Sequence, residues 1–105
     1  MATVIELIEK IRERPGLMLG RPSIRNLYAF LSGFAYARKG DNPGDYEFLS
    51  GFGKHVHLRY RISSTQSWAD IIEFFSVTEA DELRLFWKLL DEYVAKQASK
   101  RRKVS

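Results

Sequence analysis

The sequence predicts an all-α protein that folds as a single compact domain of about five helices. Apolar side chains recur at helical spacing in at least four segments, and residues that favour helix N-caps precede them. Turns rich in glycine, proline or serine separate the segments. With 105 residues, 45% of them hydrophobic, the chain can build one core but not two. We therefore expect a helical domain over residues 1–99 and a basic C-terminal tail over residues 100–105.

The first helix is expected to begin after Thr3 and to end near Arg14. Thr3 with Glu6 three residues later forms a capping box, in which each side chain satisfies a free amide at the helix start. Its apolar face consists of Val4, Leu7, Ile8 and Ile11. Pro15 disfavours a helical conformation at the residue before it and so ends the helix.

A second helix is expected after Ser23, a favourable N-cap residue. Its apolar stripe consists of Ile24, Leu27, Tyr28, Leu31, Phe34 and Ala35. Gly33 costs a helix about 1 kcal/mol relative to alanine, and we expect it to admit a close neighbouring helix. The turn segment 14–22 contains an apolar run, residues 17–19, which we expect to cap the groove between the two helices. Docking of a partner on this run is the alternative.

Residues 49–62 are compatible with two structures. Helical spacing relates Leu49, Phe52, Val56 and Tyr60. Residues 55–62, however, alternate strictly between polar and apolar, as a strand does. A strand would have no partner here, because no other segment alternates. We therefore favour a helix and keep the strand as the alternative.

Two more helices are expected in the C-terminal half. Ser67, with Asp70 three residues later, and Thr78 are N-cap candidates. Acidic residues occupy the first turn of the last helix, where the positive end of the helix dipole stabilises negative charge. Trp68 and Trp87 lie on the apolar stripes of these helices, so we expect both to be core residues.

Composition and the N-terminal sequence indicate a cytoplasmic protein. No window approaches 18 consecutive apolar residues, so we expect no membrane span. Residues 1–10 have neither the basic nor the apolar region of a signal peptide. The chain contains no cysteine, which excludes disulfides, thiolate metal ligands and cysteine nucleophiles.

Charge is distributed unevenly along the chain, whose net formal charge is +4. Residues 1–61 hold ten basic and six acidic residues, whereas residues 62–99 hold three and seven. Residues 100–103 are all basic. Such a tail is usually a solvated terminus, and the acidic segment argues against a broad cationic surface for nucleic acid.

The residue pattern predicts neither an enzyme nor a metal or cofactor site. His55 and His57 are two residues apart and diverge on a helix, whereas a zinc site needs three or four ligands. The sequence has no Gly-x-Ser-x-Gly nucleophile motif. Its adjacent carboxylates diverge on a helix, whereas acid–base catalysis needs groups that converge in a cleft. We therefore expect no catalytic residues, no metal and no cofactor.

Four arginines flank the turn before the second helix: Arg12, Arg14, Arg21 and Arg25. Arginines and helix N-termini both favour anions, although the spacing matches neither a P-loop nor a dinucleotide-binding fingerprint. We expect these arginines chiefly to pair with Glu9, Glu13 and helix-end carbonyls. A phosphate or nucleic-acid contact is the alternative.

Several motifs resemble a family of small bacterial proteins found near polymorphic or contact-dependent toxins and regarded as candidate immunity proteins. The resemblance uses Ile11-Arg12-x-Arg14-Pro15-Gly16-x-x-Leu19-Gly20 and Ser23-Ile24-x-x-Leu27-x-x-Phe30-Leu31-x-Gly33-Phe34. It continues with Phe48, Trp68-x-x-Ile71-Ile72, Phe86 and Tyr93. Family members usually have Met-Tyr where this chain has Leu17-Met18. The resemblance implies no catalytic residues and a toxin as partner.

We therefore expect a non-enzymatic protein-binding module, an immunity protein that neutralises a cognate bacterial toxin by occluding its surface. The candidate partner-binding residues are Glu79, Asp81, Glu82, Asp91 and Glu92 in the last helix, and Arg14, Arg21 and Arg25 around the turn. The alternative function is a small basic nucleic-acid-binding or regulatory protein.

Overall fold

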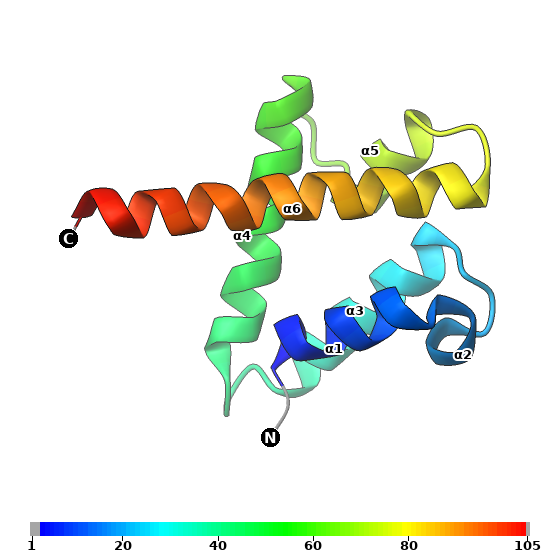
Figure 1. The fold of residues 1–105 in the computed structure, drawn as a ribbon, viewed down its shortest axis with the longest axis horizontal. Coiled ribbons are helices and arrows are strands. Elements are labelled where there is room, and N and C mark those ends of the chain that lie inside the picture. Colours follow the sequence, from blue (N-terminus) through cyan, green and yellow to red (C-terminus); the bar gives the residue numbers. More distant parts are fainter. Residues whose placement is uncertain (1–2, 105) are drawn as a thin grey trace.

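The computed structural model describes the backbone of residues 3–104 and the side chains of residues 3–100. Within this part of the chain, 78% of the residues are helical and none lies in a strand. The helices are α1 (Val4–Glu13), α2 (Pro15–Leu19), α3 (Ile24–Ala37), α4 (Pro43–Tyr60), α5 (Trp68–Phe74) and α6 (Glu79–Val104). The predicted all-α fold is confirmed (Figure 1).

The expected N-cap residues begin their helices. Thr3 and Ser23 each accept a hydrogen bond from the backbone amide three residues later. Ser67 and Thr78 form reciprocal capping boxes, because the aspartate three residues later also accepts a hydrogen bond from the N-cap amide. Four of the helix starts were therefore predictable from short-range chemistry.

Two segments expected to be turns contain helix. Pro15 and Pro43 occupy the first positions of α2 and α4, where a fixed φ and a missing amide proton are favourable. In α2, Met18 and Leu19 pack against the core, whereas Leu17 is 74% exposed. The apolar run therefore caps the core with two of its three side chains.

The ambiguous residues 55–62 are helical through Tyr60, as favoured. A strand would place Val56 and Leu58 on the same face, but Val56 is fully buried and Leu58 is 74% exposed. Arg61 then ends α4 in the left-handed conformation, with φ 55°. Leu58 is thus an exposed apolar residue of a helix, and the alternation in the sequence does not mark a buried strand face.

The helices form two layers (Figure 1). In this view α6 crosses in front of α4, and α1 lies in front of α3. α3 and α4 meet at their short connection, residues 38–42, and diverge from it. α5 lies between their far ends, where it contacts α3, α4 and α6.

The aromatic part of the core is centred on Phe52 of α4, which is fully buried. Its ring centroid lies 5.2 Å from that of Trp68, 5.3 Å from Phe86 and 5.9 Å from Tyr93, each in an edge-to-face arrangement. Helices α1 and α3 complete the core with aliphatic side chains: Val4, Ile8, Ile11, Ile24, Leu27 and Leu31.

The two tryptophans differ, in contrast to the expectation that both are core residues. Trp68 is 6% exposed, but Trp87 is only partly buried. The Trp87 ring packs against Phe86 and lies 5.0 Å beneath the guanidinium of Arg12, which also binds Asp91. Trp87 therefore belongs to the contact between α1 and α6, where a cation–π interaction covers its exposed side.

A buried carboxylate fixes the start of α1. Asp45 of α4 is 3% exposed, and its Oδ1 accepts a hydrogen bond from the backbone amide of Val4 at 3.0 Å. Its Oδ2 lies 3.5 Å from Nη1 of Arg38. Because the first amides of a helix lack partners within the helix, Asp45 couples the beginning of α1 to α4.

Helix α6 extends beyond the core. Tyr93 is its last buried residue, and residues 94–100 are exposed. Residues 100–104, which the sequence suggested as a separate tail, continue the helical backbone; the side chains of residues 101–105 lie outside the described residues. The C-terminal half of α6 therefore projects past α4 (Figure 1).

The crossing of α4 and α6 depends on Gly51. A Cβ at this position would collide with the hydroxyl of Tyr93 and lie 3.2 Å from its Cζ. Tyr93 cannot easily move away, because its ring is buried and its hydroxyl donates a 3.1 Å hydrogen bond to the carbonyl of Phe48.

We predict that Gly51→Ala lowers the free energy of unfolding by about 1–3 kcal/mol, the usual cost of overpacking. Urea denaturation measures the change. Tyr93→Phe removes the colliding atom, so Gly51→Ala should cost clearly less in that background. Equal costs in the two backgrounds would contradict this account of the crossing.

Candidate functional site

The predicted partner-binding acids are already engaged within the chain. Glu79 pairs with Arg21 at 2.7 Å, Glu82 accepts from the Ile24 amide at 3.1 Å, Asp91 pairs with Arg12 at 2.8 Å, and Glu92 lies 3.3 Å from His55 and 3.4 Å from Arg59. Asp81 binds Arg84 and caps α6 through Thr78. These residues do not form one free acidic surface.

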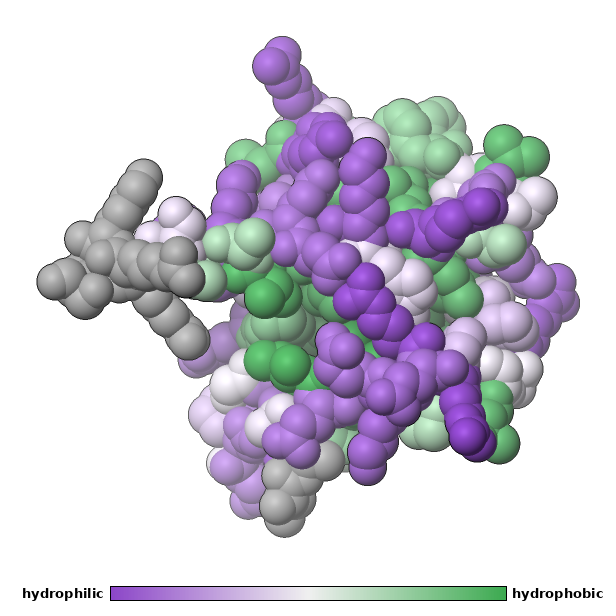
Figure 2. All heavy atoms as spheres, viewed as in Figure 1, coloured by the Kyte–Doolittle hydropathy of each residue, from purple (hydrophilic) through white to green (hydrophobic). Residues whose placement is uncertain are grey.

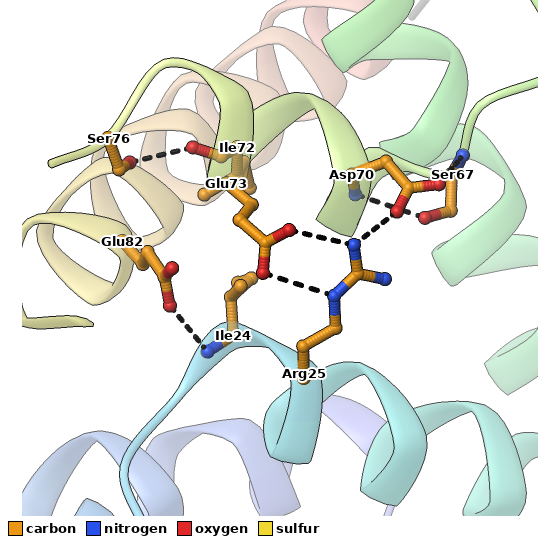
Figure 3. A network of polar contacts seen from close by, with 8 residues as sticks. All are labelled: Ile24, Arg25, Ser67, Asp70, Ile72, Glu73, Ser76 and Glu82. Carbon is orange, nitrogen blue, oxygen red and sulfur yellow. Dashed lines mark hydrogen bonds and ion pairs between the residues drawn. The ribbon is translucent and has the colours of Figure 1, made fainter. Parts of the chain in front are cut away.

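The helix N-terminus considered as an alternative anion site holds an anion from the chain itself. Figure 3 shows the carboxylate of Glu82, from α6, at the backbone amide of Ile24, the first residue of α3. Ser23 satisfies a second amide of this turn, that of Asn26. Two of the free amides that would attract a phosphate are therefore occupied by protein groups.

Arg25 joins α3 to α5. Its guanidinium lies between Asp70 and Glu73 and donates hydrogen bonds to both carboxylates (Figure 3). These hydrogen bonds hold the pKa of Asp70 and the pKa of Glu73 below their usual ranges. Arg25 was expected to pair with neighbours on α1, and that expectation is wrong, because its partners lie 45 and 48 residues away.

The other arginines that flank the turn, of which Arg14 and Arg21 were predicted to bind a partner, are dispersed. Arg12, on α1, bonds Asp91 through both terminal nitrogens, and this hydrogen bonding lowers the pKa of Asp91. Arg21 reaches α6 through Glu79. Arg14 is exposed and forms no ion pair with any residue that the structure describes. The candidate set is thus mainly a series of contacts between helices.

A groove of about 680 Å³ lies between α3 and α4, at a place that the sequence did not suggest. Its volume is within the range of ligand and peptide sites, about 300–1,000 Å³. Trp68, the first residue of α5, lines the groove where α3 and α4 are far apart. The shape follows from the fold, because two helices that diverge from a short connection leave a hollow between them.

Small residues from both helices line the groove: Ser32 and Gly33 on α3, and Ser50 and Gly53 on α4. Gly33 is exposed, and a Cβ there would meet no atom within 4 Å. The expectation that Gly33 admits a neighbouring helix of the same chain is therefore wrong. Its open side faces the groove.

Aromatic side chains lie at both ends of the groove. Tyr36 and Tyr46 flank the connection between α3 and α4 and are 76% and 46% exposed. Tyr28 packs edge-to-face on Trp68 at the other end, with a centroid distance of 5.1 Å. Tyrosine and tryptophan combine an apolar ring with a hydrogen-bonding group, which suits them to contact surfaces.

Polar groups in the groove are basic or neutral. Lys54 and His57 line it from α4, and no described carboxylate does. The Lys39 ammonium lies 4.9 Å from the ring of Tyr46. Nδ1 of His57 donates a 2.9 Å hydrogen bond to the Gly53 carbonyl, and its buried Nε2 has no hydrogen-bond partner among the described residues.

A second apolar surface surrounds the connection between α5 and α6. Figure 2 shows hydrophobic atoms in the upper right, over this part of the chain. Phe74, Phe75 and Val77 are 79%, 48% and 94% exposed. Phe75 stacks on Tyr60 at 4.4 Å, which holds this surface against the end of α4.

The described residues contain no group of three or more histidines and carboxylates placed to hold a metal ion. None of the helices in residues 3–104 is long and apolar enough to cross a membrane. Comparisons of the chain with family models, curated proteins and solved structures find no significant match.

We predict that Arg25→Gln flattens the acid dependence of stability. Because Arg25 lowers the pKa values of Asp70 and Glu73, the ionised carboxylates stabilise the folded state above about pH 4, and this stabilisation is lost as the pH falls through the lowered values. Thermal unfolding midpoints measured from about pH 7 to about pH 2.5 show the effect, because the carboxylates become protonated within this range. The variant should be less stable than the parent at pH 7 and approach it in acid.

Arg14→Gln is the matched control, since Arg14 is exposed and has no described ion pair. It should keep the parent's acid dependence. If both variants show the same pH profile, the contact of Arg25 with α5 does not determine acid stability.

Proposed function

We propose that this protein is a non-enzymatic protein-binding module whose partner occupies the groove between α3 and α4. The groove carries the proposal, because it combines tyrosine-lined ends, small residues between them and a side of Gly33 that nothing in the described chain covers. Interfaces are enriched in such aromatic residues, and a few of them usually supply most of the binding energy.

The resemblance to candidate immunity proteins supplies the nature of the partner in this proposal. A bacterial toxin would be neutralised by occlusion, which requires a stable folded surface and no catalytic group. The acidic residues of α6 then serve to hold the module together. The groove takes their place as the proposed contact with the toxin.

We predict that Gly33→Leu abolishes partner binding without loss of stability. A leucine side chain projects into the groove and blocks close approach of a partner there, while replacing an open helical glycine stabilises α3 by about 0.5–1 kcal/mol. The test establishes whether a toxin-like reading frame lies immediately upstream of the gene, co-expresses that reading frame with this chain and measures survival of the host. The host should survive with the parent chain and not with Gly33→Leu. Thermal unfolding should show that the variant is at least as stable as the parent.

Ala80→Leu is the control, because Ala80 is exposed on α6 and lies outside the groove. It should preserve survival. If Gly33→Leu also protects the host, the groove is not the binding site. If the parent chain fails to protect it, the immunity role is refuted.

A nucleic-acid-binding role is the second candidate, and the projecting end of α6 favours it. This end carries Lys96 and Lys100, followed in sequence by Arg101, Arg102 and Lys103. Clustered cations release condensed counterions from a phosphate backbone, which makes binding steeply dependent on salt.

Deletion of residues 100–105 separates the two candidates. For the protein-binding role we predict that toxin affinity changes by less than about threefold, roughly 0.7 kcal/mol. The nucleic-acid role instead requires that the full chain is retained on immobilised DNA in a salt-dependent manner and that the deletion removes this retention. Calorimetry measures the toxin affinity, and elution from the DNA column measures the retention.

A further inference from the structure

We propose that the partner segment in the groove is an acidic amphipathic helix, an inference that rests on the proposed function and specifies the partner's chemistry. The inference follows from three properties of the groove: its length, its small residues and its charge.

The length of the groove corresponds to two or three turns of helix. Its lining runs from Tyr28 to Tyr36 on α3 and from Tyr46 to His57 on α4. At 1.5 Å per residue these stretches are about 12 and 16 Å long. A partner helix of about 8–11 residues spans that distance, with one face directed into the groove as in known helix-in-groove recognition.

The small residues allow a helix backbone to approach closely. Ser32 and Gly33 line the groove from α3 and Ser50 lines it from α4, and the space beside Gly33 is open to at least 4 Å around the position of a Cβ. Small residues such as glycine and serine let helix backbones approach closely, as they do at helix interfaces in membranes. The tyrosines at the two ends leave room for short or medium apolar side chains between them.

The charge of the groove favours carboxylates on the partner. Lys54 lines the groove, the Lys39 ammonium lies over the ring of Tyr46, and no described carboxylate lines the groove or forms an ion pair with either lysine. The nearest buried acid of α4, Asp45, is directed to Arg38 and to the start of α1. Aspartate or glutamate flanking the apolar face of the partner would meet these ammonium groups and the tyrosine hydroxyls.

The probe is a display library of helix-forming peptides, about 14 residues long, randomised on one face and at its two borders. Selection uses the immobilised full chain, and clones that bind Gly33→Leu equally well are removed. We expect the surviving clones to carry an apolar stripe bordered by Asp or Glu. Their affinity should fall at least tenfold on Lys54→Glu and stay within twofold on Lys88→Glu, a control at an exposed position of α6 (tenfold corresponds to about 1.4 kcal/mol).

Other outcomes overturn the inference and are distinguishable from failure of the proposed function. Groove-dependent clones that are basic, uncharged or extended and proline-rich refute the acidic helix but leave the groove as a protein-binding site. A selection that yields only clones indifferent to Gly33→Leu, or none, refutes the acidic helix and removes support for the groove itself. Circular dichroism of the selected peptides in complex decides between helix and extended chain.

Discussion

The fold depends on the packing of three rings around the ring of Phe52. These rings bring three helices together: Trp68 comes from α5, Phe86 and Tyr93 come from α6, and Phe52 itself lies on α4. Edge-to-face contacts are directional, so they restrict the angle at which α6 crosses α4. The groove is an indirect result, because the same packing holds Trp68 between the diverging ends of α3 and α4.

The uneven charge of the sequence corresponds to ion pairs between the two halves of the chain. The basic half, residues 1–61, and the acidic half, residues 62–99, meet through Arg12–Asp91, Arg21–Glu79, Arg25 with Asp70 and Glu73, and Arg59–Glu92. Most of these side chains are partly exposed, so each pair adds little stability. Their combined effect is orientation, since each pair is satisfied in one arrangement of α1, α3 or α4 against α5 and α6.

Short-range features of the sequence predicted the all-α fold, four helix starts and the helix at residues 55–62, because caps and apolar periodicity depend on neighbouring residues. The burial of Trp87 and the partners of Arg25 were mispredicted, since both depend on which helix lies opposite. The groove was not predictable for the same reason. Gly33 was its one local signal, and a helical glycine without a partner cannot be distinguished in sequence from one beneath another helix.

Helix α5 has only seven residues, too few to be stable alone. Its order comes from Trp68 in the core and from Arg25 across the interface. Protection of α5 against hydrogen exchange therefore reports how firmly these contacts hold it. Because Trp68 also lines the groove, each opening of α5 dismantles one end of the proposed site. A partner bound in the groove should therefore slow hydrogen exchange in α5, even at residues of this helix that the partner does not cover.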